Sequence, residues 1–455
     1  MDTEKIEIGD LVELSTKKLV YGGAAIAHKE GKTIFVYGSL PDEKVVARIV
    51  RKRKGIFYAQ TEEVIEPSEK RIQPACPHFG LCGGCIWQHI PYKNQLAYKQ
   101  DIFSETVKKI SKIYDFEIEP IIPSPEEFGY RNKMEFTFGS DDRGVYLGLH
   151  KRWKFDELTP VAKDCLLIPE ELRKIVAFVE NMAQGEAPYD PRTGKGYIRF
   201  LTLRWSFLER KALVGITVTN LIEKEIYKFW FEALSKEFPK NIAGGFITIN
   251  PAGSSSQGKY IHLFGEKRIK EKIGDKIYTI SALSFFQTNP KAAKSLFDIV
   301  LEYAEPQSND TIWDLYCGAG TIGIYISEKV KSVLGIESEE VSIEDAWINV
   351  KLNNVKNSHF IHGRVNTVLA QLLKDNIAPD TIIVDPPRAG LAKKVIHKIV
   401  SFAPKKVVYV SCNPSTLARD AAEFAKYDYI LTKARPIDMF PQTYHIESVA
   451  LIVKK

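Results

Sequence analysis

The chain has 455 residues, of which 44% are hydrophobic and 26% charged, and its formal net charge is +6. A chain of this length holds about two to four domains, and its composition is typical of a globular protein, not of a histone-like polycation. No apolar run reaches the roughly 18 residues that a membrane span needs, and the N-terminus lacks a basic-then-apolar signal pattern. We therefore expect a cytoplasmic protein that makes no membrane contact.

Residues 1–66 contain short apolar or alternating segments, at 11–14, 33–37 and 44–50, separated by turns rich in glycine and proline. This pattern predicts a small β-barrel, a fold that often binds single-stranded nucleic acid through a basic rim and exposed aromatic rings. The basic run Arg51–Lys54 could form such a rim, although a solvated hairpin end explains it equally well. The candidate stacking residues, each of which is alternatively a core residue, are Tyr21, Tyr37, Phe57 and Tyr58.

Three cysteines, Cys76, Cys82 and Cys85, follow the barrel within ten residues. Clustered cysteines in a cytoplasmic protein indicate a metal site more often than a disulfide. Gly83 and Gly84 let the backbone between them turn tightly and direct N–H groups at sulfur. Cys165 is the natural fourth ligand, with His78 and His89 as alternatives. A four-cysteine site suits zinc or an iron–sulfur cluster, and the spacing does not separate the two.

Residues 67–280 mix helix and strand, which predicts a central α+β domain. A helix is expected at 92–110, and strands at 131–138, 197–204 and 212–218. Arg131 and Lys133 fall on one face of the first strand, so this face could meet RNA phosphates, although a solvated face is nearly as good an explanation.

From residue 281 strands and helices alternate, which predicts a parallel, Rossmann-like sheet. Asn289 and Pro290 should cap and begin a helix. The segment 311–321 reads as strand, glycine turn and helix, in which Gly318 allows a ligand to approach the backbone. Glu337 ends the next strand, at a position where a carboxylate binds ribose hydroxyls in such folds. The glycine turn lacks the lysine of a Walker motif, which argues against a nucleoside triphosphatase. Together with the turn Asp385–Pro387, these features favour S-adenosylmethionine over NAD or a nucleoside triphosphate.

Cys412 follows the apolar strand 407–410, and Asn413-Pro414 ends that strand. The cysteine should therefore lie at the carboxyl edge of the sheet, where α/β enzymes place their chemistry. Carbon 5 of uracil is a poor nucleophile, but a thiolate added at carbon 6 turns the ring into an enolate whose carbon 5 can attack a methyl group. A carboxylate such as Glu447, just before the last strand, could then take the proton from carbon 5.

The alternatives for these residues are structural: Cys412 could be a buried strand-end cysteine, and an acid before a terminal strand is common. Cys317 in the glycine turn is interpreted as structural, since no base is evident beside it. The turn Pro386-Pro387 argues against RNA 5-methylcytosine enzymes, which usually carry a second cysteine there. Amino-nitrogen methyltransferases share the acid–Pro–Pro turn but need no cysteine nucleophile.

With these motifs in this order, nearly the whole chain resembles the RNA 5-methyluridine methyltransferase family, in its iron–sulfur 23S rRNA branch with an N-terminal TRAM barrel. The motifs that carry the resemblance are the four cysteines and the segments 284–289 (SFFQTN), 314–320 (DLYCGAG), 385–390 (DPPRAG), 411–416 (SCNPST) and 445–447 (HIE). Where the family often has Asn or Asp near the adenine of the cofactor, this chain has Arg364, so no contact is carried over there.

The resemblance implies a TRAM-like barrel at 1–66, a central α+β domain with a [4Fe–4S] cluster at 67–280, and a class I methyltransferase domain at 281–455. It implies Cys412 as nucleophile and Glu447 as base. The cluster ligands would be Cys76, Cys82, Cys85 and Cys165. The contacts to S-adenosylmethionine would be made by Gln287, Tyr316, Gly318, Thr321, Glu337 and Asp385.

The expected function is therefore methylation of carbon 5 of a uridine in 23S rRNA, by a monomer. The same reaction on a tRNA uridine is an alternative, and a non-catalytic RNA-binding or assembly factor is another. A uracil inside folded RNA must be unpaired or flipped out before the reaction. The barrel and the basic central domain would hold the flanking RNA strand through phosphate contacts and stacking.

Overall fold

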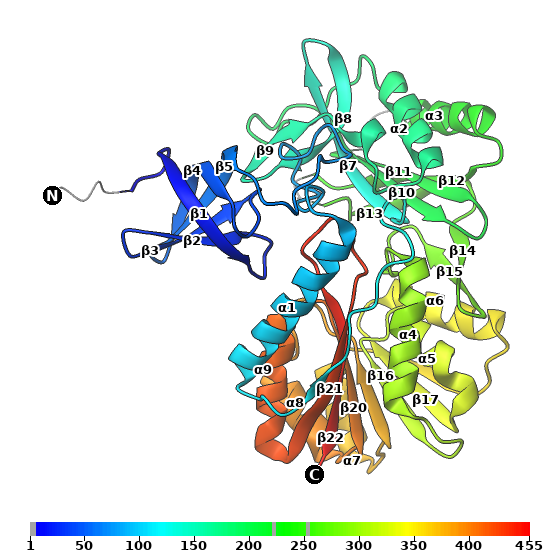
Figure 1. Cartoon of the computed structure of the whole chain (residues 1–455). Helices are drawn as coiled ribbons and strands as arrows, with labels where there is room; N and C mark the ends of the chain where they lie inside the picture. The colour runs from blue at the N-terminus through cyan, green and yellow to red at the C-terminus, as the bar shows by residue number, and fades with distance from the viewer. Residues whose placement is uncertain (1–5, 221–223, 252–254) are drawn as a thin grey trace.

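The computed structural model describes residues 6–220, 224–251 and 255–455. Figure 1 shows three parts: a small barrel (blue), a central sheet (cyan to green) and a C-terminal sheet flanked by helices (yellow-green to red). This arrangement confirms the predicted α/β class with an N-terminal barrel. Within the described ranges, no helix combines the length and apolar character needed to cross a membrane.

The barrel closes in the strand order β1-β2-β3-β5-β4. Burial alternates along β1, as expected for a strand with one face in the core. Phe57 is in that core at 2% exposure, whereas Tyr21, Tyr37 and Tyr58 are only partly buried. The strands are β1 (Leu11–Leu19), β2 (Ala25–Lys29), β3 (Lys32–Tyr37), β4 (Lys44–Arg53) and β5 (Ile56–Glu66).

The central sheet has seven strands in the order β13-β12-β11-β10-β7-β8-β9. The predicted strand at 131–138 begins at Lys133, two residues later than expected. The strands are β7 (Lys133–Asp141), β8 (Gly144–Lys151), β9 (Lys154–Thr159), β10 (Ile198–Ser206), β11 (Lys211–Val218), β12 (Ile242–Ile249) and β13 (Lys259–Gly265). This part also holds the 3-10 turn Ala162–Asp164, the helices α2 (Glu170–Met182) and α3 (Lys224–Glu237), and the hairpin β14 (Arg268–Ile273) and β15 (Lys276–Ser281).

The C-terminal sheet has eight strands in the order β18-β17-β16-β19-β20-β22-β21-β6. Its first five strands are parallel, and β22 pairs antiparallel with both β20 and β21. The strands are β6 (Glu117–Ile118), β16 (Thr311–Leu315), β17 (Ser332–Glu337), β18 (Ser358–His362), β19 (Thr381–Val384), β20 (Lys406–Ser411), β21 (Tyr429–Ile437) and β22 (Glu447–Lys454).

Helices cover both faces of this sheet, and the core lies between them. On one face are α4 (Pro290–Ala304), α5 (Thr321–Ile326) and α6 (Glu340–Leu352); on the other are α7 (Val365–Lys374), α8 (Lys393–Ser401) and α9 (Pro414–Phe424). Short 3-10 turns follow at Ser327–Lys329 and Ala425–Tyr427. As predicted, Asn289 caps α4 by accepting the N–H of Ala292, and Pro290 is its first residue.

The helix α1 (Tyr92–Ser111) and the short strand β6 lie against the C-terminal sheet, although they precede the central sheet in the chain. The strand β6 pairs with β21, and α1 packs along α9 (Figure 1). Buried apolar residues of α1, among them Ile102 and Phe103, join the same core as α9. The segment at 92–118, which sequence reasoning grouped with the central domain, therefore packs with the methyltransferase-like sheet.

Polar side chains on the buried face of α1 hold the loop 438–446, which connects β21 to β22. Lys99 Nζ lies 2.6 Å from Asp438 Oδ1, and both side chains are fully buried. Lys99 also donates to the carbonyl of Phe440. Gln95 donates to the side chain of Gln442 and accepts the backbone N–H of the same residue. The conformation of this loop thus depends on polar contacts with a helix more than 300 residues away in the chain.

Other parts of the chain bind the same loop. The backbone N–H groups of Ile86 and Trp87 donate to the carbonyl of Gln442. From the segment before β7, the Tyr130 hydroxyl donates to the carbonyl of Pro441. Asn289, which caps α4, donates to the carbonyl of Met439. The loop 438–446 is therefore the place where the cysteine segment, the central part and the C-terminal part are joined.

We expect Lys99→Met to destabilise the protein by about 3–5 kcal/mol, because it leaves the Asp438 carboxylate buried without its partner. Urea unfolding followed by circular dichroism measures this. Adding Asp438→Asn should recover part of the loss, since a neutral amide still accepts the N–H of Phe440. The matched control is Lys109→Met on the same helix, whose exposed pair with Glu105 should contribute less than about 1 kcal/mol. Equal destabilisation by the two substitutions would contradict the role given to the buried pair.

Candidate functional site

A narrow cleft lies at the carboxyl edge of the C-terminal sheet, where β16 and β19 end. The turn after β16 takes positive φ at Tyr316 (64°), Gly318 (54°) and Gly320 (73°). A Cβ atom on Gly318 would meet nothing within 4 Å, so this backbone faces open space that a ligand can enter. Five of the residues predicted to contact the cofactor line this cleft: Gln287, Tyr316, Gly318, Thr321 and Asp385.

Glu337, the sixth predicted contact, ends β17 beside the glycine turn. Its Oε2 accepts the N–H of Gly318 at 3.1 Å, and its Oε1 accepts the N–H of Glu339 at 3.0 Å. These bonds hold the carboxylate in place next to the lining of the cleft. A carboxylate in this position, at the end of the second strand, is suited to bind the hydroxyls of a ribose.

Two acids, the buried Asp314 and the half-buried Asp385, have raised pKa values in this cleft. Burial raises the pKa of Asp385 and that of Asp314 to about 7 each. Asp314 accepts the N–H of Gly323 at 2.9 Å, which anchors it below the turn. Because desolvation is what disfavours their ionised forms, a cation in the cleft would favour ionisation. The buried thiol of Cys317 also lines the cleft, although it was interpreted as structural.

Cys412 and Glu447 leave neighbouring strands at the same point. Ser411 pairs with Ser448 in the antiparallel ladder of β20 and β22, so the residues next to this pair, Cys412 and Glu447, face each other across the edge of the sheet. The Cys412 thiol is partly exposed, whereas Glu447 is buried. The two residues that the sequence singled out for covalent and proton-transfer chemistry are thus brought together.

The acids around Cys412 oppose its ionisation. Burial raises the pKa of the Cys412 thiol to about 12, with further contributions from Glu447 and Asp385. Burial, with Asp385, also holds the pKa of Glu447 well above its usual value. Arg388 acts in the opposite direction on both groups. The thiol is therefore protonated at neutral pH until positive charge enters the site.

The barrel reaches this site through the turn between β1 and β2, which sequence reasoning did not foresee. The ring of Tyr21 makes an edge contact with Tyr444, with 5.9 Å between centroids. A Cβ atom on Gly23, whose φ is 86°, would lie 2.1 Å from Ile86 Cδ1 and 3.0 Å from Tyr444 Cβ, so glycine suits this close approach. Burial, together with the nearby Tyr444 and Cys412, raises the pKa of the Tyr21 phenol. The sequence marks Tyr21 only as a candidate for stacking on RNA, because its contacts with Tyr444 and Cys412 lie more than 390 residues away in the chain.

The four cysteines predicted to bind a metal line one small cavity. Cys76, Cys82 and Cys85 come from the loop before α1, and Cys165 follows the 3-10 turn after β9. Burial raises the pKa of all four thiols, and the N–H of Gly84 points at the Cys82 sulfur at 3.3 Å. Across the described residues, no three His, Cys, Asp or Glu side chains lie close enough to hold one metal ion. Of the two alternative histidines, His78 also lines this cavity and pairs with Asp164 at 3.1 Å, whereas His89 does not line it.

Comparison with known proteins adds the identity of the family. The family described as tRNA (uracil-5-)-methyltransferase matches residues 91–455. The chain belongs to this family. An uncharacterized RNA methyltransferase of Caldanaerobacter subterraneus is 37% identical over 451 residues, covering 98% of this chain and 99% of its own. One from Clostridium acetobutylicum is 36% identical, covering 97% of each chain.

Among solved structures, a Pyrococcus abyssi tRNA (uracil-54, C5)-methyltransferase in complex with S-adenosyl-L-homocysteine is similar over the whole chain. The TM-score is 0.77 with 26% identity, and the match covers 97% of this chain and 99% of the other. Membership of the family confirms the predicted reaction class, S-adenosylmethionine-dependent methylation of carbon 5 of uracil in RNA. In this uracil methyltransferase, five of the six residues predicted to contact that cofactor line the cleft described above.

We expect the affinity for S-adenosylmethionine to increase with pH, by about tenfold for each pH unit up to pH 7, and to level off above pH 7. The sulfonium favours ionised Asp385, whose pKa is raised to about 7, so binding below that pH must release a proton. Titration calorimetry between pH 5.5 and 8 measures this. S-adenosylhomocysteine carries the same amino and carboxyl groups as S-adenosylmethionine but lacks the sulfonium charge. Its affinity should therefore depend less on pH. An identical pH dependence for the two ligands, or its persistence in Asp385→Asn, would contradict this assignment.

Proposed function

We propose that this uracil methyltransferase methylates carbon 5 of one uridine in 23S rRNA, with Cys412 as the nucleophile and Glu447 as the base. The observation that carries the proposal is the placement of Cys412 opposite Glu447, with both groups near enough to Asp385 of the cofactor cleft to feel its charge. The proposal includes the cytoplasmic location and the monomeric state expected from the sequence. It also includes the roles of Gln287, Tyr316, Gly318, Thr321, Glu337 and Asp385 in binding S-adenosylmethionine.

The reaction follows from these positions. The Cys412 thiolate would add to carbon 6 of the uracil. Carbon 5 of the resulting enolate would attack the methyl carbon of S-adenosylmethionine, and the bond between that methyl group and sulfur would break to release S-adenosylhomocysteine. Glu447 then takes the proton from carbon 5, and the bond between sulfur and carbon 6 breaks to restore the ring and the thiolate. Because the pKa of the thiol is raised to about 12 in the free protein, the sulfonium of the cofactor and the cation of Arg388 are the charges that would favour the thiolate.

The choice of rRNA rests on the four-cysteine site and the barrel, which we propose to be a TRAM-like RNA-binding domain at residues 1–66. A tRNA uridine is the second candidate, because the similar Pyrococcus abyssi protein is a tRNA methyltransferase. The proposed domains are completed by the central part at 67–280 and the methyltransferase part at 281–455. A non-catalytic assembly factor is disfavoured, since it would have no reason to keep Cys412 and Glu447 paired.

We also propose that Cys76, Cys82, Cys85 and Cys165 hold a [4Fe–4S] cluster. All four sulfurs line one cavity, yet no three of the described donor groups are close enough for a single ion. Four cysteine thiolates are a usual ligand set of a [4Fe–4S] cluster, and the choice of a cluster over zinc comes from the family resemblance. The N–H of Gly84, aimed at the Cys82 sulfur, is the kind of donor that stabilises a thiolate ligand. When bound, the cluster would link the segment before α1 to the central sheet.

The test of function uses 23S rRNA and tRNA transcripts with tritium at carbon 5 of uridine. Wild-type protein and S-adenosylmethionine should release tritium into water from the rRNA, because carbon 5 must lose its hydrogen. Release from the tRNA alone would keep the mechanism and overturn the choice of RNA. Methyl transfer without tritium release would mean that another atom is methylated.

The two proposed roles separate in variants. Cys412→Ala should reduce tritium release at least 1,000-fold while binding S-adenosylmethionine normally, because the covalent step is lost. Glu447→Gln should transfer the methyl group but fail to release the proton, so a protein–RNA adduct that survives denaturing electrophoresis should accumulate. Cys317→Ser serves as the control cysteine and should form no less product per bound cofactor. Full turnover by Cys412→Ala would refute the mechanism.

Anaerobically purified wild-type protein should contain about four iron and four sulfide ions per chain and absorb near 400 nm, as expected for the cluster. Cys82→Ser should lower both contents, because it removes a ligand. Cys317→Ser, a buried cysteine outside the set, should leave them unchanged. One zinc ion per chain and no sulfide would show that the four cysteines bind a single ion instead.

A further inference from the structure

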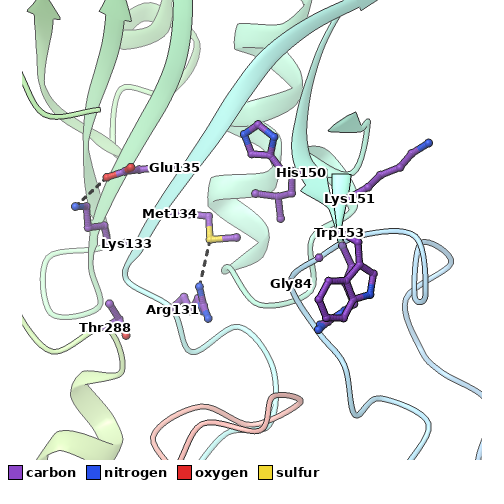
Figure 2. A pocket seen from close by; sticks show the side chains of 12 residues that line it. Gly84, Arg131, Lys133, Met134, Glu135, His150, Lys151, Trp153 and Thr288 are labelled. Carbon is purple, nitrogen blue, oxygen red and sulfur yellow. Dashed lines mark hydrogen bonds and ion pairs between the residues drawn. The ribbon is translucent and has the colours of Figure 1, made fainter. Parts of the chain in front are cut away.

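A cavity of about 580 Å³ opens beside the cysteine loop, far larger than the roughly 20 Å³ at the cofactor cleft. Three separate parts of the chain line it: the cysteine loop at Gly83 and Gly84, the strands β7 and β8 with the turn that follows β8, and Thr288 before α4. Figure 2 shows these residues around the open space, with Trp153 and Gly84 on one side and Thr288 and Lys133 on the other. A space of this size accommodates a nucleotide.

Polar atoms at the wall of this cavity lack partners. Trp153 Nε1, Thr288 Oγ1 and His150 Nδ1 are buried and make no hydrogen bond with any residue in the described parts of the chain. Buried polar groups are nearly always hydrogen-bonded in folded proteins, so three such groups around one cavity call for an explanation. A bound ligand with its own donors and acceptors provides one.

The charge of the lining favours an anion. Four cationic side chains, Arg131, Lys133, Lys151 and Arg152, line the cavity together with a single acid, Glu135. Glu135 pairs with Lys133 at 3.0 Å, and Lys151 pairs with Glu157 outside the cavity. Arg152 forms no ion pair within the described ranges, and its guanidinium lies 5.1 Å from the centre of the Tyr37 ring. It is therefore placed to meet a phosphate.

Trp153 contributes an aromatic ring to the wall of the cavity, although its backbone conformation is one that disfavours a bulky residue. It is the second residue of the two-residue turn between β8 and β9, with φ 69°, where a type II turn normally has glycine. A bulky residue in this conformation is a true outlier, and such strain is kept where a function needs the side chain. Edge and tilted contacts with Tyr37 and Tyr58 of the barrel, at 5.0 and 6.0 Å, orient its ring.

The cavity is not the site of methyl transfer, since Cys412, Glu447 and Asp385 do not line it. It lies next to that site, because Thr288 in its wall directly follows Gln287 in the cofactor cleft. An RNA strand that delivers a flipped uracil to Cys412 would therefore bring its neighbouring nucleotides to this cavity.

We propose that this cavity binds a second unpaired nucleotide of the RNA, close in sequence to the target uridine. The base stacks on Trp153 and its edge bonds to Thr288 and His150, while Arg152 meets the phosphate. The inference rests on the proposed function, because it takes the target uracil to lie at Cys412. It makes RNA selection depend on two extruded bases, one that reacts and one that is only recognised.

The test measures the dissociation constants of full-length protein for fluorescein-labelled 23S rRNA and tRNA transcripts by anisotropy. Trp153→Gly should raise the constant by about 5- to 100-fold through lost stacking, and glycine suits the backbone there. Thr288→Val, which removes only the unpartnered hydroxyl, should raise it about fivefold. Arg152→Gln should weaken binding and reduce the salt dependence by about one phosphate contact. The control variants Arg143→Gln and Phe229→Ala, exposed and outside the cavity, should bind like the wild type.

A scan with abasic nucleotides identifies the recognised base. In the RNA that binds, one abasic position near the target should weaken binding to the wild type but not to Trp153→Gly, because the stacking partner is already missing. If the losses of affinity from the abasic nucleotide and from Trp153→Gly were additive at every position, the proposal would be overturned. Unchanged binding in both Thr288→Val and Arg152→Gln, or failure of the wild type to bind either transcript, would also overturn it. Normal binding without tritium release would instead show that the proposed reaction fails while the nucleotide site stands.

Discussion

The buried pair between Lys99 and Asp438 is the interaction on which the active site depends. Two opposite charges without solvent are tolerated because each has a partner, and removing either would leave an unpaired charge in the core. Such a pair adds little net stability compared with apolar packing, so its value lies in specifying one geometry. Here it specifies the loop 438–446, which leads directly into Glu447 and presents Tyr444 to the barrel. The strand that begins at Glu447 is thus positioned by a helix that precedes the central sheet.

This constraint explains why three parts of the chain act as one uracil methyltransferase. The cysteine segment, the residue Tyr130 before β7, and the cap of α4 all donate hydrogen bonds to carbonyls of the same loop. The barrel adds the turn at Gly23, whose positive φ and close neighbours Ile86 and Tyr444 favour glycine. A loop without regular structure keeps one conformation because its carbonyls are satisfied from several directions. Movement of any one part would therefore disturb the position of Glu447.

The sequence predicted what depends on local order. The strand before Cys412, the glycine turn at Gly318 and the cap at Asn289 each carry a short-range signal, and each element forms where expected. The antiparallel pairing that sets Cys412 opposite Glu447 could be anticipated only from the resemblance, since alternation alone predicts parallel strands. The packing of α1 on α9, the approach of Tyr21 to Tyr444 and the cavity at Trp153 join residues that are far apart in sequence. No periodicity or motif encodes such contacts, so they required the structure.

The surroundings of the site also change the pKa values of the groups that these contacts bring together. Burial raises the pKa of Asp385 to about 7 and that of the Cys412 thiol to about 12, so the surroundings shift both groups toward their neutral forms. A cationic cofactor reverses this balance, because the ionised forms of both groups gain from a nearby positive charge. In the proposed mechanism the thiolate would form mainly when the methyl donor is bound, which would keep Cys412 from reacting before transfer is possible. Under the proposed roles, the dry surroundings that raise the pKa of the Cys412 thiol are what couple its activation to the cofactor.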